Sequence, residues 1–431
     1  MDQAIVTIAA YTEPVYCNFY LKHRYNSNIN KPENPNFNQW RSGKLVILSY
    51  IRSGRNILLF VPLVTALMLL MSCVATTPEK KEPPVKREKQ ELVFPPPPEV
   101  PRYHFEGMLF SNVQVEAVEA GKESYWKKLL TGEEENNSKT KGLAKPYDVV
   151  ACQGRVFVSD TVARLVYLFD FERQRFVEIG TKEPGDLRKP LGLNTDGDCN
   201  LYVADVTKNK IMIYNKNGEY ISSLNVAGKF QRMSHLAVTA DGSKIFIVDT
   251  GGVGSDEHLI RVFDVRTGDH LYDIGTRGEK EGMFNLPKDI EIGPDGNLYV
   301  VDSGNFRIQV MGQDGTFIRS FGTIGSRPGQ FTRPKGIAID QNTGIIYVVD
   351  TAFGNFQIFN QETQLMMHIG TRGNAFAPGV YMLPAGIDVD EDGRIYIVDQ
   401  FFRKVDIYRP VELPASTGAI GRKITGTTPA E

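Results

Sequence analysis

The sequence predicts an all-β chain that forms a six-bladed β-propeller of four-stranded antiparallel blades. A unit of about 45 residues recurs six times over residues 143–410 of the 431-residue chain, and this period is typical of stacked or closed repeat proteins. The first five copies each hold four short runs of β-branched and aromatic residues that end in Asp-Gly, Asn or Gly turns, and the sixth holds three. Four strands per unit, with no helical pattern between units, favour radial stacking over a sandwich or a horseshoe.

The second strand of every unit ends in an Asp. Because the six positions are equivalent, we expect each carboxylate to accept backbone N–H groups of the following loop, and we prefer this turn role to a metal site. The six residues are Asp160, Asp205, Asp249, Asp302, Asp350 and Asp399. The Gly-rich stretches between units, such as residues 275–278, do not follow a strand and open a helix, so we interpret them as turns and not as phosphate-binding loops.

Ring closure is predicted to use the N-terminal side of the repeats. The sixth unit has three strand-like runs and then reaches Pro410 and Pro414 without a fourth. Residues 102–107 parallel the fourth strand at 317–322, and an open ring would expose a strand edge. We therefore expect a closing strand over 102–110 that pairs with residues 404–408, so that the propeller domain covers 102–410.

Composition excludes one class of partner. A net charge of −2 gives no broad basic field, so no nucleic-acid partner is expected, and a hydrophobic content of 41% can fill a sizeable core. We expect a monomeric propeller.

The N-terminal part has the layout of an export signal. Arg52 and Arg55 precede an apolar run at 57–70, too short for a comfortable membrane span, which ends at Cys73. This ending resembles a bacterial lipoprotein box, although Met71 departs from its usual small or β-branched residue. The resemblance implies a signal peptide over 51–73 and lipid on Cys73; the alternatives are an uncleaved anchor helix or a buried segment. Residues 74–101 are rich in Pro and Lys, as in an extended tether.

The first fifty residues do not fit a signal peptide. They form a polar, Asn-rich stretch that includes Cys17 and Trp40. We interpret residues 1–50 as an over-extended or disordered start, with translation beginning near residues 48–51. The alternative is a genuine extension.

Two cysteines fall within the repeats. Cys152 and Cys199 lie in turns between the first and second strands of adjacent units, where an exported protein permits a disulfide. Their registers differ, so we expect two separate thiols in preference to a bond. No Cys-x-x-Cys pair is present to suggest a thiolate zinc site.

The repeats resemble NHL repeats. Pro334-Lys335-Gly336-Ile337 matches the start of the NHL unit, and residues 302–310 match its Asp and Asn-x-Arg-Ile-x-Val segments. The resemblance implies the propeller fold but leaves function open, because the family includes scaffolds, nucleic-acid binders and, among its relatives, enzymes. The whole chain also resembles exported bacterial NHL-repeat lipoproteins.

Related six-bladed enzymes suggest an alternative function. Amidating lyases use His ligands around the axis, and gluconolactonase-like calcium hydrolases use carboxylates and Asn there. Asp148 and Asp289 occupy a position that is Gly in other units, so they are weak candidates for calcium; we prefer solvated carboxylates at the channel mouth. Only His235 begins an inner strand, so a three-His zinc site is not favoured. The channel-mouth candidates are Asp148, His235, Lys288, Asp289 and Lys335.

The loops at the mouth where the inner strands begin are the expected partner surface. The long third-unit loop and the Phe pair in the sixth unit break the repeat pattern, and aromatic and Arg side chains are favoured anchors. For the Arg and Phe residues the alternative is bracing of loops and filling of gaps between blades. The candidates are Asp256, Glu257, His258, Arg307, Phe353, Phe401, Phe402 and Arg403.

Two further segments lie outside the repeat. Residues 122–130 place Tyr125, Trp126, Leu129 and Leu130 on one side of a short helix, which we expect to cap the propeller in preference to contacting a membrane. Residues 411–431 are expected to be a flexible tail.

Taken together, these features favour a non-catalytic binding or assembly module held to the membrane by lipid on Cys73, in the bacterial cell envelope and at the outer membrane in a Gram-negative cell. Its partner would be an envelope protein or peptide. No catalytic residue and no cofactor are assigned, and a calcium- or zinc-dependent hydrolase or lyase at the central channel is the alternative.

Overall fold

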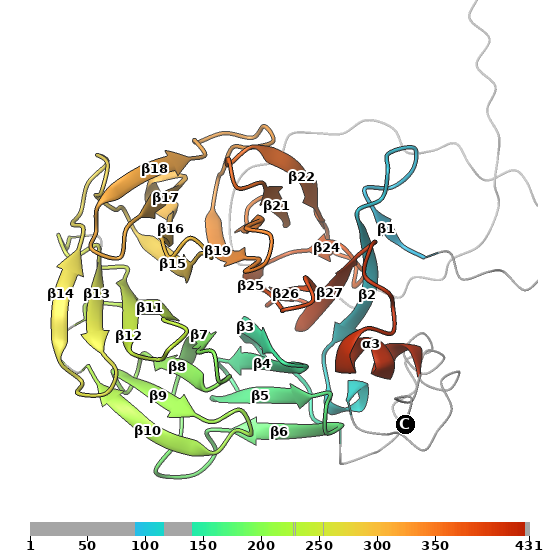
Figure 1. Cartoon of the computed structure of the whole chain (residues 1–431), viewed down its shortest axis with the longest axis horizontal. Helices are drawn as coiled ribbons and strands as arrows, with labels where there is room; N and C mark the ends of the chain where they lie inside the picture. Colours follow the sequence, from blue (N-terminus) through green and yellow to red (C-terminus); the bar gives the residue numbers. More distant parts are fainter. Residues whose placement is uncertain (1–90, 116–139, 227, 229, 253, 427–431) are drawn as a thin grey trace, which may run out of the picture. The chain divides into compact units, whose positions relative to one another are not determined.

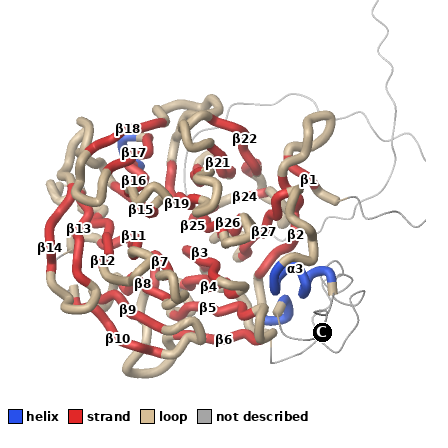
Figure 2. The backbone as a smooth tube through the Cα atoms, in the orientation of Figure 1, coloured by secondary structure: helices blue, strands red, loops and turns tan. Residues whose placement is uncertain are grey.

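A computed structural model of the protein describes residues 91–115, 140–226, 228, 230–252 and 254–426. Within these residues, six antiparallel blades stand in a ring, each with its first strand innermost (Figure 1). Strands run through the whole ring, and the helical segments are few and short (Figure 2). The predicted fold class is confirmed.

The first three blades follow the chain order. Blade 1 contains β3 (Pro146–Cys152), β4 (Arg155–Asp160), β5 (Leu165–Asp170) and β6 (Arg175–Ile179). Blade 2 contains β7 (Pro190–Thr195), β8 (Leu201–Asp205), β9 (Lys210–Tyr214) and β10 (Tyr220–Asn225). Blade 3 contains β11 (Met233–Val238), β12 (Lys244–Asp249), β13 (Leu259–Asp264) and β14 (His270–Ile274).

The last three blades continue this order until the ring closes. Blade 4 contains β15 (Pro287–Ile292), β16 (Leu298–Asp302), β17 (Arg307–Met311) and β18 (Phe317–Phe321), with the 3₁₀ helix η3 (Ser303–Asn305). Blade 5 contains β19 (Pro334–Ile339), β20 (Ile346–Asp350), β21 (Asn355–Phe359) and β22 (Leu365–Ile369). A parallel pair, β23 (Thr371–Arg372) and β24 (Val380–Tyr381), leads to blade 6, whose first three strands are β25 (Pro384–Val389), β26 (Ile395–Asp399) and β27 (Lys404–Pro410).

The predicted closing strand is confirmed. Strand β2 (Tyr103–Leu109) pairs antiparallel with β27, from Tyr103 opposite Pro410 to Leu109 opposite Val405. Strand β1 (Val93–Phe94) then adds a fifth strand outside β2, and the 3₁₀ helix η2 (Asn112–Gln114) follows it. Because the N-terminal strand completes the last blade, the outer edge of β27 is paired.

The hydrophobic core is divided among the seams between blades. Six buried clusters each combine residues of two neighbouring blades. Val158 of blade 1 and Val398 of blade 6, for example, lie in one cluster and are fully buried. The second strands are buried on both faces because each blade is packed between two others, which explains their continuous runs of Val, Ile and Tyr.

The repeated Asp residues have the predicted turn role. Asp350 is fully buried; its Oδ2 accepts the N–H groups of Thr332 and Arg333 at 2.7 and 3.0 Å, and its Oδ1 accepts those of Ala352 and Phe353. The other five carboxylates accept equivalent backbone donors. Each one fixes the segment that enters an inner strand, and most also fix the loop that follows their own strand.

Two expectations are wrong. Residues 411–431 are not simply a flexible tail, because helix α3 (Gly418–Thr425) buries Ala419 and Ile420 in the seam between blades 1 and 6. Cys152 and Cys199 form a disulfide, with Cα atoms 5.9 Å apart. The spacing of the two cysteines did not predict this bond, because Cys199 lies in a turn with a positive φ of 61°, a local conformation that the register of the repeats does not specify.

The predicted segments at 1–50, 51–73 and most of 74–101, together with the helix at 122–130, lie outside the described residues. In the part of the chain that the structure describes, no helix is long and apolar enough to cross a membrane.

Candidate functional site

The first strands of the blades bring the channel-mouth candidates to the ring axis. We call the face where these strands begin the start face; it carries the loops between second and third strands, such as residues 400–403. The opposite turn face carries the turns between first and second strands, such as residues 153–154.

All six inner strands have an irregular register near their second and third residues, which releases those side chains from regular pairing.

His235 joins two carboxylates from different blades. Its Nε2 lies 2.6 Å from Asp148 Oδ2, and its Nδ1 lies 2.6 Å from Asp289 Oδ1. Burial alone would lower the pKa of His235, but the carboxylates of Asp289 and Asp148 raise it well above its ordinary value. Both ring nitrogens face carboxylate oxygens, so the imidazolium form suits both contacts. We call these three residues the axial triad.

Glycines make room for the axial triad. A Cβ at Gly192 would lie 2.6 Å from His235 Cα, and a Cβ at Gly386 would lie 2.7 Å from Asp148 Cα. These glycines occupy the inner-strand position that holds Asp148, His235 and Asp289 in the other blades. The presence of Gly in three blades and of charged residues in the other three therefore reflects close packing across the axis.

Asp148 and Asp289 are buried, with 2% and 3% of their surfaces exposed, so the expectation of solvated carboxylates is wrong. Besides His235, Asp148 accepts the N–H of Leu193 at 2.7 Å, and Asp289 accepts that of Ile337 at 2.9 Å. Both donors belong to the inner strand of the next blade, whose axis-facing edge would otherwise carry an unpaired N–H. The sequence could not reveal this burial because it depends on how six strands meet.

A second polar layer lies two residues further along the inner strands. Asp388 Oδ2 accepts the N–H of Ala151 at 2.6 Å, and Asn194 Oδ1 accepts that of Val238, again from the next blade. Asn194 Nδ2 also donates to Glu291 at 3.3 Å. Burial raises the pKa of Glu291 to about 8 and that of Asp388 well above its ordinary value, so both side chains favour the neutral acid.

Two lysines lie on the start-face side of the axial triad. Lys288 and Lys335 are the second residues of neighbouring inner strands and are partly buried. Lys335 Nζ lies 4.6 Å from the ring centroid of Tyr147, a cation–π distance. Burial lowers the pKa of both lysines to about 8.

The axial carboxylates do not form an open cation site. Each already accepts from His235 and from a backbone N–H. Among the residues that the structure describes, no group of three or more His, Cys, Asp or Glu side chains is arranged to hold a metal ion.

The partner-surface candidates separate into two groups. His258 is 1% exposed, and it accepts the N–H of Leu286 and contacts Gly252 O, so its expected place on the surface is wrong. Arg307 binds Asp302 at 2.8 Å and donates to two carbonyls of the preceding connector, which is the bracing role left open by the sequence. Asp256 is exposed, and Glu257 pairs with Arg261 at 3.0 Å.

Aromatic side chains gather at the start face of blade 6. Phe401 is 55% exposed, and its ring meets Phe402 edge to face at 5.1 Å between centroids. Phe376, which is 45% exposed, lies 6.2 Å from both Phe402 and Phe110. We call these four residues the aromatic cluster. Phe353 is partly buried, whereas Arg403 beside the cluster is exposed.

The sequence argument missed Phe376. It lies in the connector between blades 5 and 6, and a signal was present, because this connector replaces the polar residues of the equivalent turns with Ala375, Phe376 and Ala377. Lys404 lies fully buried beneath the cluster, where its Nζ binds Asp406 at 2.8 Å and Ala377 O at 2.7 Å.

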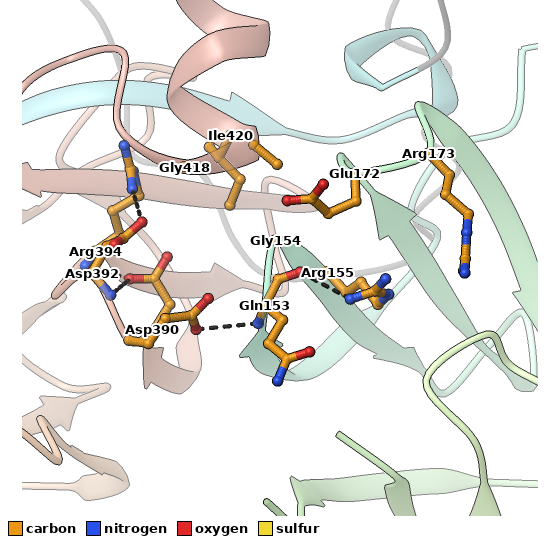
Figure 3. A pocket seen from close by; sticks show the side chains of 12 residues that line it. Gln153, Gly154, Arg155, Glu172, Arg173, Asp390, Asp392, Arg394, Gly418 and Ile420 are labelled. Atoms are coloured by element: carbon orange, nitrogen blue, oxygen red, sulfur yellow. Dashed lines mark hydrogen bonds and ion pairs between the residues drawn. The ribbon is translucent and has the colours of Figure 1, made fainter. Parts of the chain in front are cut away.

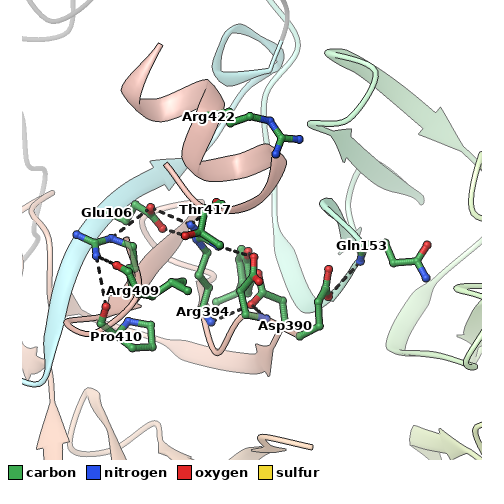
Figure 4. Close-up of polar contacts among 12 residues, drawn as sticks. Glu106, Gln153, Asp390, Arg394, Arg409, Pro410, Thr417 and Arg422 are labelled. Atoms are coloured by element: carbon green, nitrogen blue, oxygen red, sulfur yellow. Dashed lines mark hydrogen bonds and ion pairs between the residues drawn. The ribbon is translucent and has the colours of Figure 1, made fainter. Parts of the chain in front are cut away.

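A polar pocket of about 520 Å³ lies on the turn face, between the turns of blades 1 and 6 and next to α3 (Figure 3). Gln153, Glu172 and Asp390 line it, but several of its polar groups already have partners. Arg394 binds Asp392, Glu106 and Thr417 O (Figure 4). This arrangement fastens α3 and the closing strand to blade 6, so we assign it a structural role.

Comparisons with known proteins agree with this architecture. A family profile described as a 6-bladed beta-propeller matches residues 287–356. Protein brain tumor of Drosophila melanogaster is 30% identical over 136 residues, which cover 31% of this chain and 12% of that protein. NHL repeat-containing protein 3 of Homo sapiens is 24% identical over 199 residues, which cover 44% of this chain and 55% of that protein. The matched segments thus span 12% of the length of the first relative and 55% of the length of the second.

Solved structures are similar in fold alone. A streptogramin B lyase has a TM-score of 0.44 and 13% identity, with 62% of this chain and 94% of that chain covered. A gluconolactonase from Xanthomonas campestris has a TM-score of 0.47 and 17% identity, with 62% and 86% covered. The protein is a six-bladed β-propeller whose homologues include NHL-repeat proteins.

Proposed function

We propose that this protein is a non-catalytic, lipid-anchored binding or assembly module that presents its start face to an envelope protein or peptide. The observation that supports this most is the aromatic cluster, in which Phe376 and Phe401 each leave about half of their surface in solvent. Large exposed aromatic side chains grouped in one place are typical of interaction sites.

The cluster is held in a fixed geometry. Asp399 Oδ1 accepts the N–H groups of Phe401 and Phe402 at 2.9 and 2.8 Å, and Lys404 supports the rings from below at 5.9–6.0 Å from the centroids of Phe376 and Phe402. A prearranged surface loses less conformational entropy when a partner binds.

The surrounding charge indicates the chemistry of the partner. Arg403 next to the cluster is exposed, and so are Arg164 and Lys145 on the start face of the adjacent blade 1. Apolar rings beside basic side chains complement a segment that carries apolar residues next to Asp or Glu. We therefore propose an acidic and apolar partner segment.

Two features support an extracytoplasmic location. Cys73 and the apolar run before it have the sequence of a lipidation signal, and they lie outside the described residues. The Cys152–Cys199 disulfide is of a kind that persists mainly in oxidising compartments. Both are compatible with an envelope protein whose propeller extends from the membrane on the Pro-rich tether.

The test compares capture by variants of the full-length protein. Wild type, F376A/F401A and the control I318A, which removes an exposed apolar side chain on an outer strand, are crosslinked to envelope extracts. We expect one set of crosslinked proteins to be lost from F376A/F401A and kept by I318A. An identical set from all three proteins would contradict the assignment of the surface.

Membrane contact by the aromatic cluster is distinguished in a second experiment. We expect C73S to leave the membrane fraction and to show no affinity for phospholipid vesicles. If C73S binds the vesicles and the combined variant C73S/F376A/F401A does not, the cluster contacts lipid and not a protein partner.

A further inference from the structure

We infer that the start-face end of the ring axis holds an oxyanion-binding site, in which Lys288 and Lys335 bind a carboxylate or phosphate group above the axial triad. This site is separate from the aromatic cluster and does not depend on the function proposed above. The inference reverses the cation-site alternative that Asp148 and Asp289 suggest in the sequence.

Neither ammonium group makes a hydrogen bond or a close ion pair within the part of the chain that the structure describes, and the carboxylates of Asp148 and Asp289 act on Lys335 only at longer range. The ion pairs around the axis use the carboxylates of Asp148 and Asp289 for His235, and Lys335 has only the Tyr147 ring as a close partner. A partly buried ammonium without an anionic partner is costly, because burial removes water and returns no hydrogen bond. The lowered pKa values of both lysines, about 8, reflect this cost and still leave them mostly protonated at neutral pH.

The charge balance of the axis is positive. The positive charge of His235 offsets the negative charge of one of the two triad carboxylates. The two lysine charges then outnumber the one carboxylate charge that remains. Arg232 and Lys145 add positive charge, since Arg232 lowers the pKa of Lys288 and Lys145 lowers that of Lys335. Glu291 and Asp388, deeper along the axis, add little negative charge because their raised pKa values favour the neutral acid.

The two lysines are held on anchored strands and keep partial contact with solvent. Lys288 and Lys335 extend from adjacent strands that are anchored by Asp302 and Asp350. Two ammonium groups on neighbouring rigid strands can donate to different oxygens of one carboxylate or phosphate. Tyr147 of blade 1 lies beside Lys335, and burial raises the pKa of its phenol and keeps it protonated.

The experiment measures oxyanion binding to the full-length protein by calorimetry and thermal unfolding. Inorganic phosphate and succinate are titrated separately, with sodium chloride at matched ionic strength as the reference. Wild type, K288M, K335M and K288M/K335M are compared with K216M, which removes an exposed lysine on the turn face. Methionine keeps the length and apolar stem of lysine and removes the charge.

We expect phosphate or succinate to raise the unfolding temperature of wild type and K216M above the chloride reference. Each single variant should bind about tenfold more weakly or worse, because one charge-assisted contact is lost. The double variant should lose the oxyanion effect and unfold at a higher temperature than wild type without ligand, because the unpaired charges are gone. Binding of phosphate alone or succinate alone identifies the natural group, and binding of both supports the shared chemistry.

Two results would overturn the inference. One is a wild-type response to both oxyanions that equals the response to chloride. The other is an oxyanion effect that survives in K288M and K335M. If the double variant does not fold, the two single variants still decide between these outcomes.

Discussion

Glu106 and Arg394 form a buried ion pair, with 2.7 Å between Oε2 and Nε, although 288 residues separate them in the sequence. Glu106 belongs to the closing strand β2, and Arg394 directly precedes β26 of the same blade. Arg394 is fully buried and also donates to Asp392 and to Thr417 O, which leads into α3. One side chain therefore connects the N-terminal strand, the last blade and the C-terminal helix (Figure 4).

Substituting Arg394 by Met should lower the free energy of unfolding by about 3–5 kcal/mol, because Glu106 would keep a buried charge with only Arg409 nearby. E106Q should also be destabilising. The double variant E106L/R394M should lose less than the sum of R394M and E106L, since it removes both members of the pair together, although Arg409 and Asp392 each lose one contact. Urea unfolding of wild type, R394M, E106L and E106L/R394M completes the cycle, and strictly additive losses would show that the pair does not act as a unit.

The closing strand could be predicted from the sequence, but its ion pair could not. The repeat supplies a count of strands per blade, so a missing fourth strand in the last unit identifies residues 102–110 as its replacement. Arg394 and Glu106 carry no pattern of this kind, because the equivalent positions of the other blades hold other residue types, such as Asn297 in place of Arg394. The ring geometry alone brings them together.

The axial triad, too, could be predicted only in part from the sequence. The repeat predicts that Asp148, His235 and Asp289 start inner strands, because they replace residues at one position of the unit. It does not predict that His235 reaches past blade 2 to Asp148. That contact requires Gly192 to lack a side chain, and its place opposite His235 appears only when the six strands surround one axis.

Reduction of the Cys152–Cys199 disulfide should lower the stability of the propeller by about 2–4 kcal/mol, because the bond closes a loop of 47 residues between blades 1 and 2. Wild type in dithiothreitol and C152S/C199S without reductant should show the same decrease in unfolding temperature. Dithiothreitol should not change C152S/C199S further. If it does, the reductant acts elsewhere, and equal stabilities of wild type and C152S/C199S would mean that the bond contributes nothing.

The axial triad should make stability depend on pH through His235. Its pKa is raised in the folded protein by Asp289 and Asp148, so the folded state binds the proton more tightly than the unfolded state. The stabilisation is therefore complete below the unfolded pKa of about 6.5 and is lost as the pH rises through the higher folded pKa. At low pH it is also lost once the carboxylates are protonated.

H235Q keeps a polar side chain of similar length but leaves two buried carboxylates without their cation. We expect it to be less stable than wild type by about 3–5 kcal/mol near pH 6, with a smaller difference at alkaline pH, where His235 of the wild type loses its proton. The free energy of unfolding of both proteins, measured by urea titration from about pH 5 to pH 10, gives this difference directly. H270Q is the control, because His270 pairs with Asp273 on the exterior of blade 3. A difference between wild type and H235Q that stays constant with pH would show that His235 is held neutral between Asp148 and Asp289, and that the axis carries one positive charge fewer than the oxyanion site requires.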